Sequence, residues 1–176
     1  MTAYRRVKTP GATYFFTVNL ADRQDNPLLV NHIGLLRQVF RRIKQDHPFL
    51  IDAMVVLPDH LHCLWTLPPG DADYKTRWAL IKAGFSRGIP LVERRSRSRM
   101  KRGERGIWQR RFWEHLIRDD RDYRRHVDYI HWNPVKHGWV ERVSDWPHSS
   151  FHAHVRRGIV PVDWADEPNE DFEAGE

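Results

Sequence analysis

The sequence contains one cysteine, Cys63, and no apolar run that approaches the roughly 18 residues of a membrane span. A single cysteine excludes a disulfide within the chain. Residues 1–8 lead into Thr9-Pro10-Gly11 and not into an apolar stretch, so we expect no secretion signal. These absences together predict a cytoplasmic protein that makes no contact with membranes.

Acidic residues are concentrated at the end of the chain. Residues 161–176 hold seven acids and no Lys or Arg, so residues 1–160 carry a net charge of +13, against +6 for the whole chain. Such a basic body attracts polyanions by electrostatic steering and counterion release, and we expect nucleic acid as its partner. We predict one domain over 1–160 and an acidic, flexible tail over 161–176, which either screens the basic face or serves only solubility.

The hydrophobic patterning alternates between the periods of strands and helices. We expect strands over 14–20, 50–57, 60–67 and 112–117, and helices over 31–45, 73–86 and 120–132. Asn31 is the expected N-cap of the first helix, and Pro134 is expected to end the last one. The first six elements follow the split βαβ, or ferredoxin-like, plan. The predicted fold class is α+β, with two helices on one face of an antiparallel sheet, and a C-terminal helix and tail in addition.

His60 and His62 flank Leu61 on the third predicted strand, which follows a tight turn at Pro58-Asp59. Since side chains alternate along a strand, the two imidazoles point to one face, while Leu61 and Cys63 point to the other. Two imidazoles side by side on a rigid strand can chelate one metal ion. In a chain with 11 histidines this spacing also fits a pair of ordinary surface histidines.

The last predicted helix carries two stripes of side chains. One stripe has core spacing and consists of Tyr123, Val127 and Ile130. The second, rotated by about 90°, consists of Asp122, His126, Tyr129 and Asn133. Tyr129 and Asn133 are one turn apart, so a phenol and an amide oxygen face the same way. Taken alone, Tyr129 also fits a half-buried aromatic residue, and Asn133 fits a helix C-cap.

Considered together, the histidine pair and the second stripe favour phosphodiester chemistry. A tyrosine hydroxyl can attack phosphorus and form a covalent intermediate, and a metal ion can polarise a phosphate oxygen. Two imidazoles and one amide oxygen leave coordination positions open for phosphate, which favours Mg²⁺ or Mn²⁺ over Zn²⁺. Because cysteine ligands are lacking, we do not expect a closed structural zinc site.

Five segments resemble those of a known family, the REP-associated tyrosine transposases, which belong to the single-tyrosine HUH (His-hydrophobic-His) transposases. The segments are Pro58-Asp59-His60-Leu61-His62, Trp78 to Lys82 with Phe85 and Ser86, Trp108 to His115, Tyr129 to Gly138, and Trp146 to Phe151. They occur in the family's order, and the resemblance spans residues 4–164.

The resemblance implies an HUH nuclease fold, in which His60 and His62 bind a divalent metal ion with Asn133 as the third ligand, at a place where the wider group often has Gln. It implies that Tyr129 is the nucleophile and that cleavage leaves a 5′-phosphotyrosine and a 3′-hydroxyl. Tyr123 lies in the core stripe, so we expect no second nucleophile. The implied substrate is single-stranded DNA that bears a palindromic REP hairpin and a guide tetranucleotide. The implied process is DNA transposition and recombination, by a monomer or a homodimer that associates with the nucleoid when bound to DNA.

Residues 93–111 hold nine Lys or Arg and only two acids. We predict a mobile basic loop that contacts DNA, with a merely solvated loop as the alternative. The predicted DNA-binding residues are Lys82, Arg94, Arg95, Arg97, Arg99, Lys101, Arg102, Arg105, Arg110 and Arg111. From Arg94 to Trp113, Trp108 and Trp113 offer aromatic surface, although we expect Trp78 and Trp108 to be structural and not stacked on bases.

Two other functions remain open. A rolling-circle replication or relaxase-type nuclease uses the same chemistry but usually carries larger accessory domains, for which 176 residues leave little room. A domesticated, non-catalytic DNA- or RNA-binding module would retain the site residues as relics. The intact set of His60, His62, Tyr129 and Asn133 argues against the second alternative.

Overall fold

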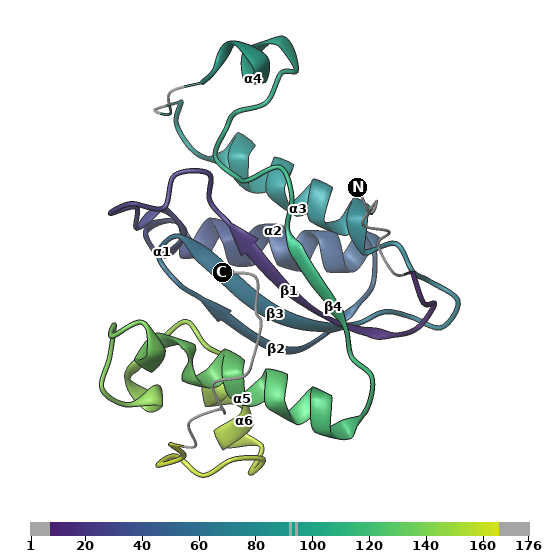
Figure 1. Cartoon of the computed structure of the whole chain (residues 1–176), viewed down its shortest axis with the longest axis vertical. Coiled ribbons are helices and arrows are strands. Elements are labelled where there is room, and N and C mark those ends of the chain that lie inside the picture. The colour runs from purple at the N-terminus through teal and green to yellow at the C-terminus, as the bar shows by residue number, and fades with distance from the viewer. Residues whose placement is uncertain (1–7, 92, 94, 166–176) are drawn as a thin grey trace, which may run out of the picture.

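In the computed structural model, residues 8–91, 93 and 95–165 are described. Arg94, which we predict to bind DNA, residues 1–7 and most of the acidic tail lie outside the described residues. The elements, in chain order (Figure 1), are β1 (Thr13–Asn19), α1 (Leu28–Asn31), α2 (Ile33–Asp46), β2 (Leu50–Val56), β3 (His60–Thr66), α3 (Tyr74–Gly88), α4 (Arg97–Lys101), β4 (Trp113–Leu116), α5 (Asp120–Lys136), the 3-10 helix η1 (Val143–Asp145) and α6 (Phe151–Arg156). No helix within the described ranges is both long and apolar enough to cross a bilayer.

A four-stranded antiparallel sheet, in the order β2-β3-β1-β4, forms the centre of the fold. β2 and β3 form the predicted hairpin, and Leu57 closes it with an amide that donates to the carbonyl of His60 at 2.9 Å. β1 lies between β3 and β4, which places Thr17 opposite His62 and Phe15 opposite His115. The strand order and the crossovers through α2 and α3 confirm the predicted split βαβ plan.

Each face of the sheet carries its own apolar cluster. α2 and α3 cover one face, where Trp78 stacks on Trp65 with ring centroids 4.4 Å apart. Trp108 is buried in the same cluster, so the structural role predicted for Trp78 and Trp108 agrees with their burial. α5 covers the other face and packs Val127 and Ile130 against the sheet (Figure 1). The helix that carries Tyr129 therefore covers the face opposite α2 and α3.

The predicted N-cap of the first long helix is wrong. Asn31 is the last residue of the short helix α1, and its amide donates to the carbonyl of Pro27 at 2.9 Å. His32 takes the N-cap position of α2 without a capping hydrogen bond from its side chain. Because Asn31 already has helical backbone in this additional turn, it cannot serve as the N-cap of α2, whose backbone would have to be non-helical.

The predicted end of the last helix is also wrong, because α5 passes through Pro134 and continues to Lys136. The chain leaves the helix at Gly138, whose φ of +69° lies in the left-handed region that favours glycine. Amide donors beyond the helix then satisfy the last carbonyls, those of Asn133, Pro134 and Val135. The longer helix brings Lys136 onto the same face as Tyr129.

The basic segment over 93–111 is more structured than predicted. It contains α4, which Ser96 caps by accepting a hydrogen bond from the amide of Arg99 at 3.3 Å. Arg105 ties the segment to the end of α3, because its guanidinium donates to the carboxylate of Glu93 and to the carbonyls of Ser86, Ile89 and Pro90. This arginine therefore holds the segment in place.

Candidate active site

His60 and His62 project from β3 toward α5, while Leu61 and Cys63 lie in the cluster on the opposite face. The alternation predicted from the sequence is therefore present. The centroids of the two imidazole rings are 5.0 Å apart. Their relative exposures are 1% for His60 and 0% for His62, so they are not ordinary surface histidines.

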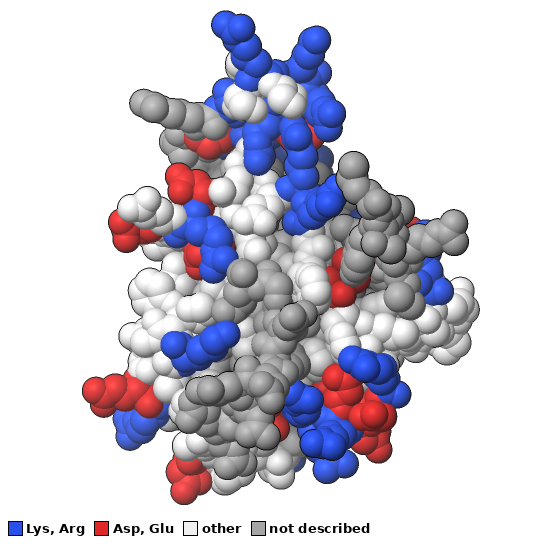
Figure 2. Space-filling model, viewed as in Figure 1, with Lys and Arg blue, Asp and Glu red and all other residues white. Residues whose placement is uncertain are grey.

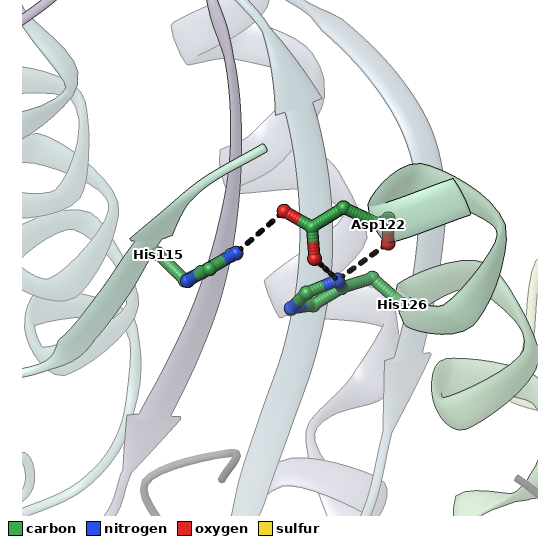
Figure 3. Close-up of side chains that lie close together, drawn as sticks. All are labelled: His115, Asp122 and His126. Carbon is green, nitrogen blue, oxygen red and sulfur yellow. Dashed lines mark hydrogen bonds and ion pairs between the residues drawn. The ribbon is translucent and has the colours of Figure 1, made fainter. Parts of the chain in front are cut away.

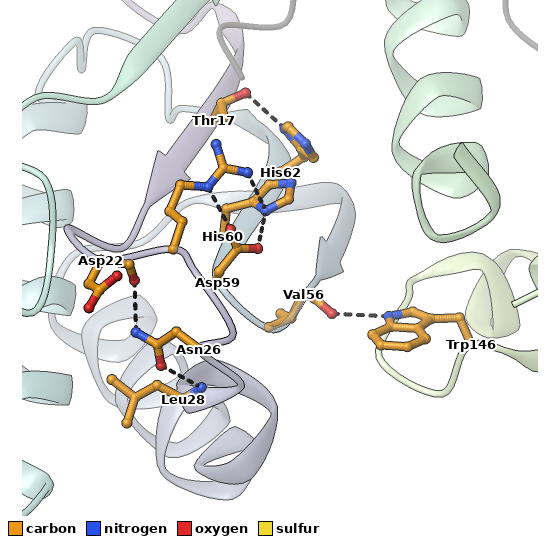
Figure 4. Close-up of polar contacts among 10 residues, drawn as sticks. Thr17, Asp22, Asn26, Leu28, Val56, Asp59, His60, His62 and Trp146 are labelled. Atoms are coloured by element: carbon orange, nitrogen blue, oxygen red, sulfur yellow. Dashed lines mark hydrogen bonds and ion pairs between the residues drawn. The ribbon is translucent and has the colours of Figure 1, made fainter. Parts of the chain in front are cut away.

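Neighbouring side chains hold the Nδ1 atom of each ring (Figure 4). Oγ1 of Thr17 lies 2.8 Å from Nδ1 of His62, across the β1–β3 pairing. The carboxylate of Asp59 lies 2.7 Å from Nδ1 of His60, and Arg23 donates to the same carboxylate at 2.5 Å. Such partners orient the imidazoles of metal sites. With Nδ1 engaged, Nε2 is the nitrogen that each ring can offer to a metal ion.

The charges around His60 follow from burial and pairing. Burial lowers the pKa of His60, and this effect outweighs the hydrogen bond that His60 donates to Asp59, which raises it. Burial raises the pKa of Asp59, but its interactions with His60 and Arg23 outweigh burial and lower this pKa to about 2. At neutral pH the site therefore combines a neutral imidazole with an ionised carboxylate. The neutral imidazole is the form that binds a metal ion.

The helix α5 brings the predicted second stripe to this face of the sheet. Tyr129 is 4% exposed, and its ring centroid lies 5.3 Å from that of His62. Asn133, one turn further on, is fully buried. Tyr123 belongs to the other stripe, and its hydroxyl donates to Asp52 on β2 at 3.2 Å. The two segments singled out in the sequence thus meet in the structure.

Lys136 is a site residue that the sequence reasoning missed. Its Nζ lies 3.1 Å from the hydroxyl of Tyr129 and 4.8 Å from the centroid of that ring. An ammonium group at this distance donates a hydrogen bond to the phenol oxygen and stabilises negative charge on it. The seven-residue spacing, two helical turns, was visible in the sequence, but Pro134 was expected to end the helix before it.

Asn19 is a second missed residue. It pairs with His60 in the β1–β3 register and shares the face of Thr17. Asn19 is 8% exposed, and its Oδ1 has no hydrogen-bond partner within the described part of the chain. Leaving a buried polar atom unpaired costs free energy, so this oxygen is available to a group that binds at the site.

A pocket of about 460 Å³ opens beside His60. Its walls include Arg23, Asp59, His137 and Trp139, and the ring of His137 lies 5.1 Å from that of His60. A ligand in this pocket would reach the edge of the buried histidine pair from solvent.

The predicted DNA-binding cations fall into two groups. The exposed members, around α4 and β4, are Arg95, Arg97, Lys101, Arg102, Arg110 and Arg111. Figure 2 shows Lys and Arg side chains gathered at the α4 end of the molecule. Others also support the fold, since Lys82 donates to the carbonyl of Gln109 at 3.0 Å and Arg99 to that of Trp108 at 3.3 Å.

A second pocket, of about 640 Å³, lies between α3 and the basic segment. The cations that line it are Lys82, Arg87, Arg99, Arg105 and Arg110. One acid, Glu104, shares the pocket and lies 2.9 Å from Nε of Arg110. Cations of the basic segment therefore line this concave pocket, and others are exposed around α4, at what we call the exposed tip of the segment.

The comparisons with known proteins agree on one family. The chain is 51% identical over 176 residues to the REP-associated tyrosine transposase of Escherichia coli (strain K12), which covers 100% of the chain and 98% of the relative. A protein of Haemophilus influenzae is 48% identical over 170 residues, or 96% of each chain. A solved structure of a REP-associated tyrosine transposase bound to a REP hairpin has a TM-score of 0.86 and 50% identity, with coverage of 100% and 98%. No protein-family model matches the chain.

Proposed function

The chain belongs to the REP-associated tyrosine transposases, DNA-cleaving enzymes, and from this premise we propose that it cleaves and rejoins single-stranded DNA beside a REP-type hairpin. Tyr129 is the nucleophile in this proposal. The observation that carries it is the packing of Tyr129, on α5, against His62, on β3, with ring centroids 5.3 Å apart. In this proposal the phenol and the pair of oriented imidazoles act on the same phosphate.

In the proposed reaction, the oxygen of Tyr129 attacks phosphorus and the bond from phosphorus to the 3′ oxygen breaks. The products are a 5′-phosphotyrosine and a DNA end with a 3′-hydroxyl, so the phenol proton is transferred, in sum, to the leaving oxygen. Rejoining is the reverse, with a 3′-hydroxyl attacking the phosphotyrosine. Lys136 stabilises the negative charge that forms on the Tyr129 oxygen. Burial of Tyr129 limits the access of water to the covalent intermediate.

The residues at the site fit a divalent metal ion. His60 and His62 supply Nε2 atoms whose rings are oriented through Nδ1, and Asn133 supplies an amide oxygen. Nε2 of His60 is buried and, in the described ranges, has no hydrogen-bond partner, as expected of an atom that serves a bound group. We propose Mg²⁺ or Mn²⁺, which would polarise the scissile phosphate. Thr17 and Asp59 would then fix the two imidazoles in their binding orientation.

The DNA surface in this proposal combines the exposed tip of the basic segment with the cationic pocket beside α3. Single-strand binders pair cationic grooves with aromatic surfaces, and Trp113 on β4 is half-buried next to the segment. The relative whose structure contains a REP hairpin supports a hairpin as the ligand. The proposal includes action at the nucleoid, as a monomer or as a homodimer.

A cleavage assay tests the proposal against its two rivals. The wild-type chain and Tyr129→Phe are incubated with a hairpin oligonucleotide and Mn²⁺, and products are separated on a denaturing gel. We expect cleavage and a protein–DNA adduct from the wild type alone. Hairpin binding without any adduct from the wild type would favour a non-catalytic binding module. Cleavage of origin-type or nick-site DNA in preference to the hairpin would favour a replication or relaxase-type nuclease.

A further inference from the structure

A second group of metal-ligand side chains lies beside the candidate active site. His115 projects from β4, and Asp122 and His126 project from successive turns of α5 (Figure 3). One ligand atom from each residue lies within 4.8 Å of the other two. The helical spacing of Asp122 and His126 predicted that they share a face of their helix. The position of His115 beside them follows only from the pairing of β4 in the sheet.

The contacts within this group are close and specific. Nε2 of His115 lies 2.8 Å from Oδ2 of Asp122, and Nδ1 of His126 lies 3.3 Å from Oδ1 of the same carboxylate. The two imidazole rings are stacked, with centroids 4.7 Å apart and 16° between their planes. Ligands at the usual 2.0–2.1 Å from a tetrahedral zinc ion are separated by about 3.3 Å. Only small side-chain movements would bring the three ligand atoms to such separations.

Two members of the group, His126 and Asp122, are in the charge state that a metal ion requires. Burial is the largest effect on His126 and lowers its pKa to about 4. Burial raises the pKa of Asp122, but the hydrogen bond from His115 and the amide of Arg118 outweigh burial and lower it. At neutral pH His126 is therefore neutral and Asp122 is ionised. Metal binding would still require Nδ1 of His126 to give up the hydrogen bond that it makes with the carbonyl of Asp122, at 2.7 Å.

We propose that His115, Asp122 and His126 form a second metal site, separate from the His60–His62 pair, that binds Zn²⁺ through two imidazoles and one carboxylate. Imidazole ligands favour zinc and its neighbours over magnesium. Three protein ligands leave a fourth position for water. The proposed catalytic site, with its amide oxygen and phosphate, favours a harder ion, so the two sites would differ in metal preference.

The position of this site indicates what it does. The ring of Phe15 separates it from the histidine pair, since the Phe15 centroid lies 4.7 Å from that of His126 and 5.6 Å from that of His62. His126 precedes Tyr129 by one turn of α5. A metal ion bound here would join the edge strand β4 to the first turns of α5 and fix the helix that presents Tyr129. The site acts on the position of the nucleophile and does not touch the DNA phosphate.

Zinc titration of the full chain tests this proposal. The starting protein is His60→Ala/His62→Ala, which lacks the pair assigned to catalysis, and the comparison protein adds Asp122→Asn and His126→Gln. Calorimetry should show one Zn²⁺ per chain in the first protein and an affinity reduced about tenfold or more in the second. Zn²⁺ at about 100 times the Kd of the first protein should raise its Tm by about 5–10 °C, and the same concentration should raise the Tm of the second by at most about half as much. His32→Gln/His47→Gln, made in the same starting protein, removes two histidines outside the group and should retain the site.

The titration distinguishes a metal site from a cluster that only forms hydrogen bonds, and its result does not depend on the proposed nuclease reaction. If the starting protein binds no Zn²⁺, or if Asp122→Asn/His126→Gln leaves the affinity unchanged, the three residues serve only as a hydrogen-bonded cluster and the proposal is wrong. A second measurement avoids the alanine variants. Asp122→Asn made in the wild-type background should lower the number of Zn²⁺ ions bound per chain by one. The Tyr129 adduct assay is read independently, so failure of the zinc site leaves the proposed nuclease reaction untouched.

Discussion

Nζ of Lys136 donates a hydrogen bond of 3.1 Å to the hydroxyl of Tyr129, two turns back along α5. The contact pairs an ammonium group with the proposed nucleophile, whose side chain is 4% exposed. A charge at this position favours the transition state, in which the phenol oxygen carries more negative charge than in the resting enzyme.

Lys136→Gln should therefore slow cleavage by about ten- to a hundredfold. Single-turnover kinetics with saturating hairpin DNA separate a slower cleavage step from weaker DNA binding. Weaker binding would instead raise the DNA concentration that gives half of the maximal rate. Lys136→Arg keeps the charge and should recover part of the rate. Arg124→Gln, an exposed cation on the same helix, is the matched control and should cleave at nearly the wild-type rate. Equal rates for Lys136→Gln and the control would remove Lys136 from the mechanism.

Thr17 is expected to act through His62. Thr17→Val removes the hydroxyl that lies 2.8 Å from Nδ1 of His62 while keeping the side-chain volume. Loss of such an orienting contact typically weakens metal affinity by about 10- to 100-fold. The Mn²⁺ concentration that gives half-maximal cleavage should rise by this factor, and excess Mn²⁺ should restore the rate. Thr13→Val on the same strand, which breaks a pair with Thr66, is the control; the same shift in both variants would contradict an effect through His62.

The exposed tip of the basic segment should contribute to DNA affinity through charge. Arg97→Gln/Lys101→Gln removes two exposed cations of α4, while Arg41→Gln/Arg42→Gln removes two exposed cations of α2. Each lost phosphate contact reduces the slope of log K against log salt by about 0.7–0.9. The α4 pair should therefore flatten the slope of hairpin binding by about one to two, measured by fluorescence anisotropy over a salt series. An unchanged slope would place α4 outside the interface.

The ion pair between Asp71 and Arg77 should give part of the folded stability a defined pH dependence. Arg77 is 3% exposed and its guanidinium lies 2.6 Å from the carboxylate of Asp71, whose pKa this hydrogen bond lowers. A carboxylate with a lowered folded-state pKa stabilises the protein above its unfolded pKa of 3.8, and this contribution is lost as pH falls through the folded value. At pH 7, Asp71→Asn should lower the free energy of unfolding by about 0.5–1.5 kcal/mol.

Urea unfolding at pH 7 and at pH 3 checks this assignment. The difference between the wild type and Asp71→Asn should shrink at the lower pH, where the wild-type carboxylate begins to bind a proton. Glu141→Gln removes an exposed carboxylate and should change the stability by less than about 0.5 kcal/mol at either pH. If Asp71→Asn lowers the free energy of unfolding by the same amount at both pH values, the charge of Asp71 is not the cause.

The alternation of β3 and the stripe on α5 could be predicted because each depends on one local period. His60 and His62 share a face because residues two apart on a strand do so, and Tyr129 and Asn133 share one because they are a turn apart. Their meeting required β3 and α5 to pack together, which the family resemblance implied and the periods alone did not. The roles of these residues remain predictions until the reaction is measured.

The contacts of Thr17 and His115 depend on the pairing of segments that are distant in the sequence. Thr17 reaches His62 only because β1 pairs with β3 in one register, and His115 reaches His126 only because β4 pairs with β1 next to α5. The helix ends were misjudged for a local reason: Pro134 was given more weight than Gly138, whose left-handed backbone actually ends the last turn. A proline near a helix end is tolerated when the following residues satisfy the remaining carbonyls.

The polarity of the covalent intermediate tests the central proposal most directly. A hairpin oligonucleotide labelled on the 3′ side of the cleavage point is incubated with the wild type and Mn²⁺, denatured and digested, and the labelled peptide is identified by mass spectrometry. We expect one phosphate-linked peptide, with the DNA 5′ end joined to Tyr129, and a released fragment that ends in a 3′-hydroxyl. Cleavage by the wild type with no linked peptide, or a linkage to any other residue, would contradict the assignment of Tyr129 as the nucleophile.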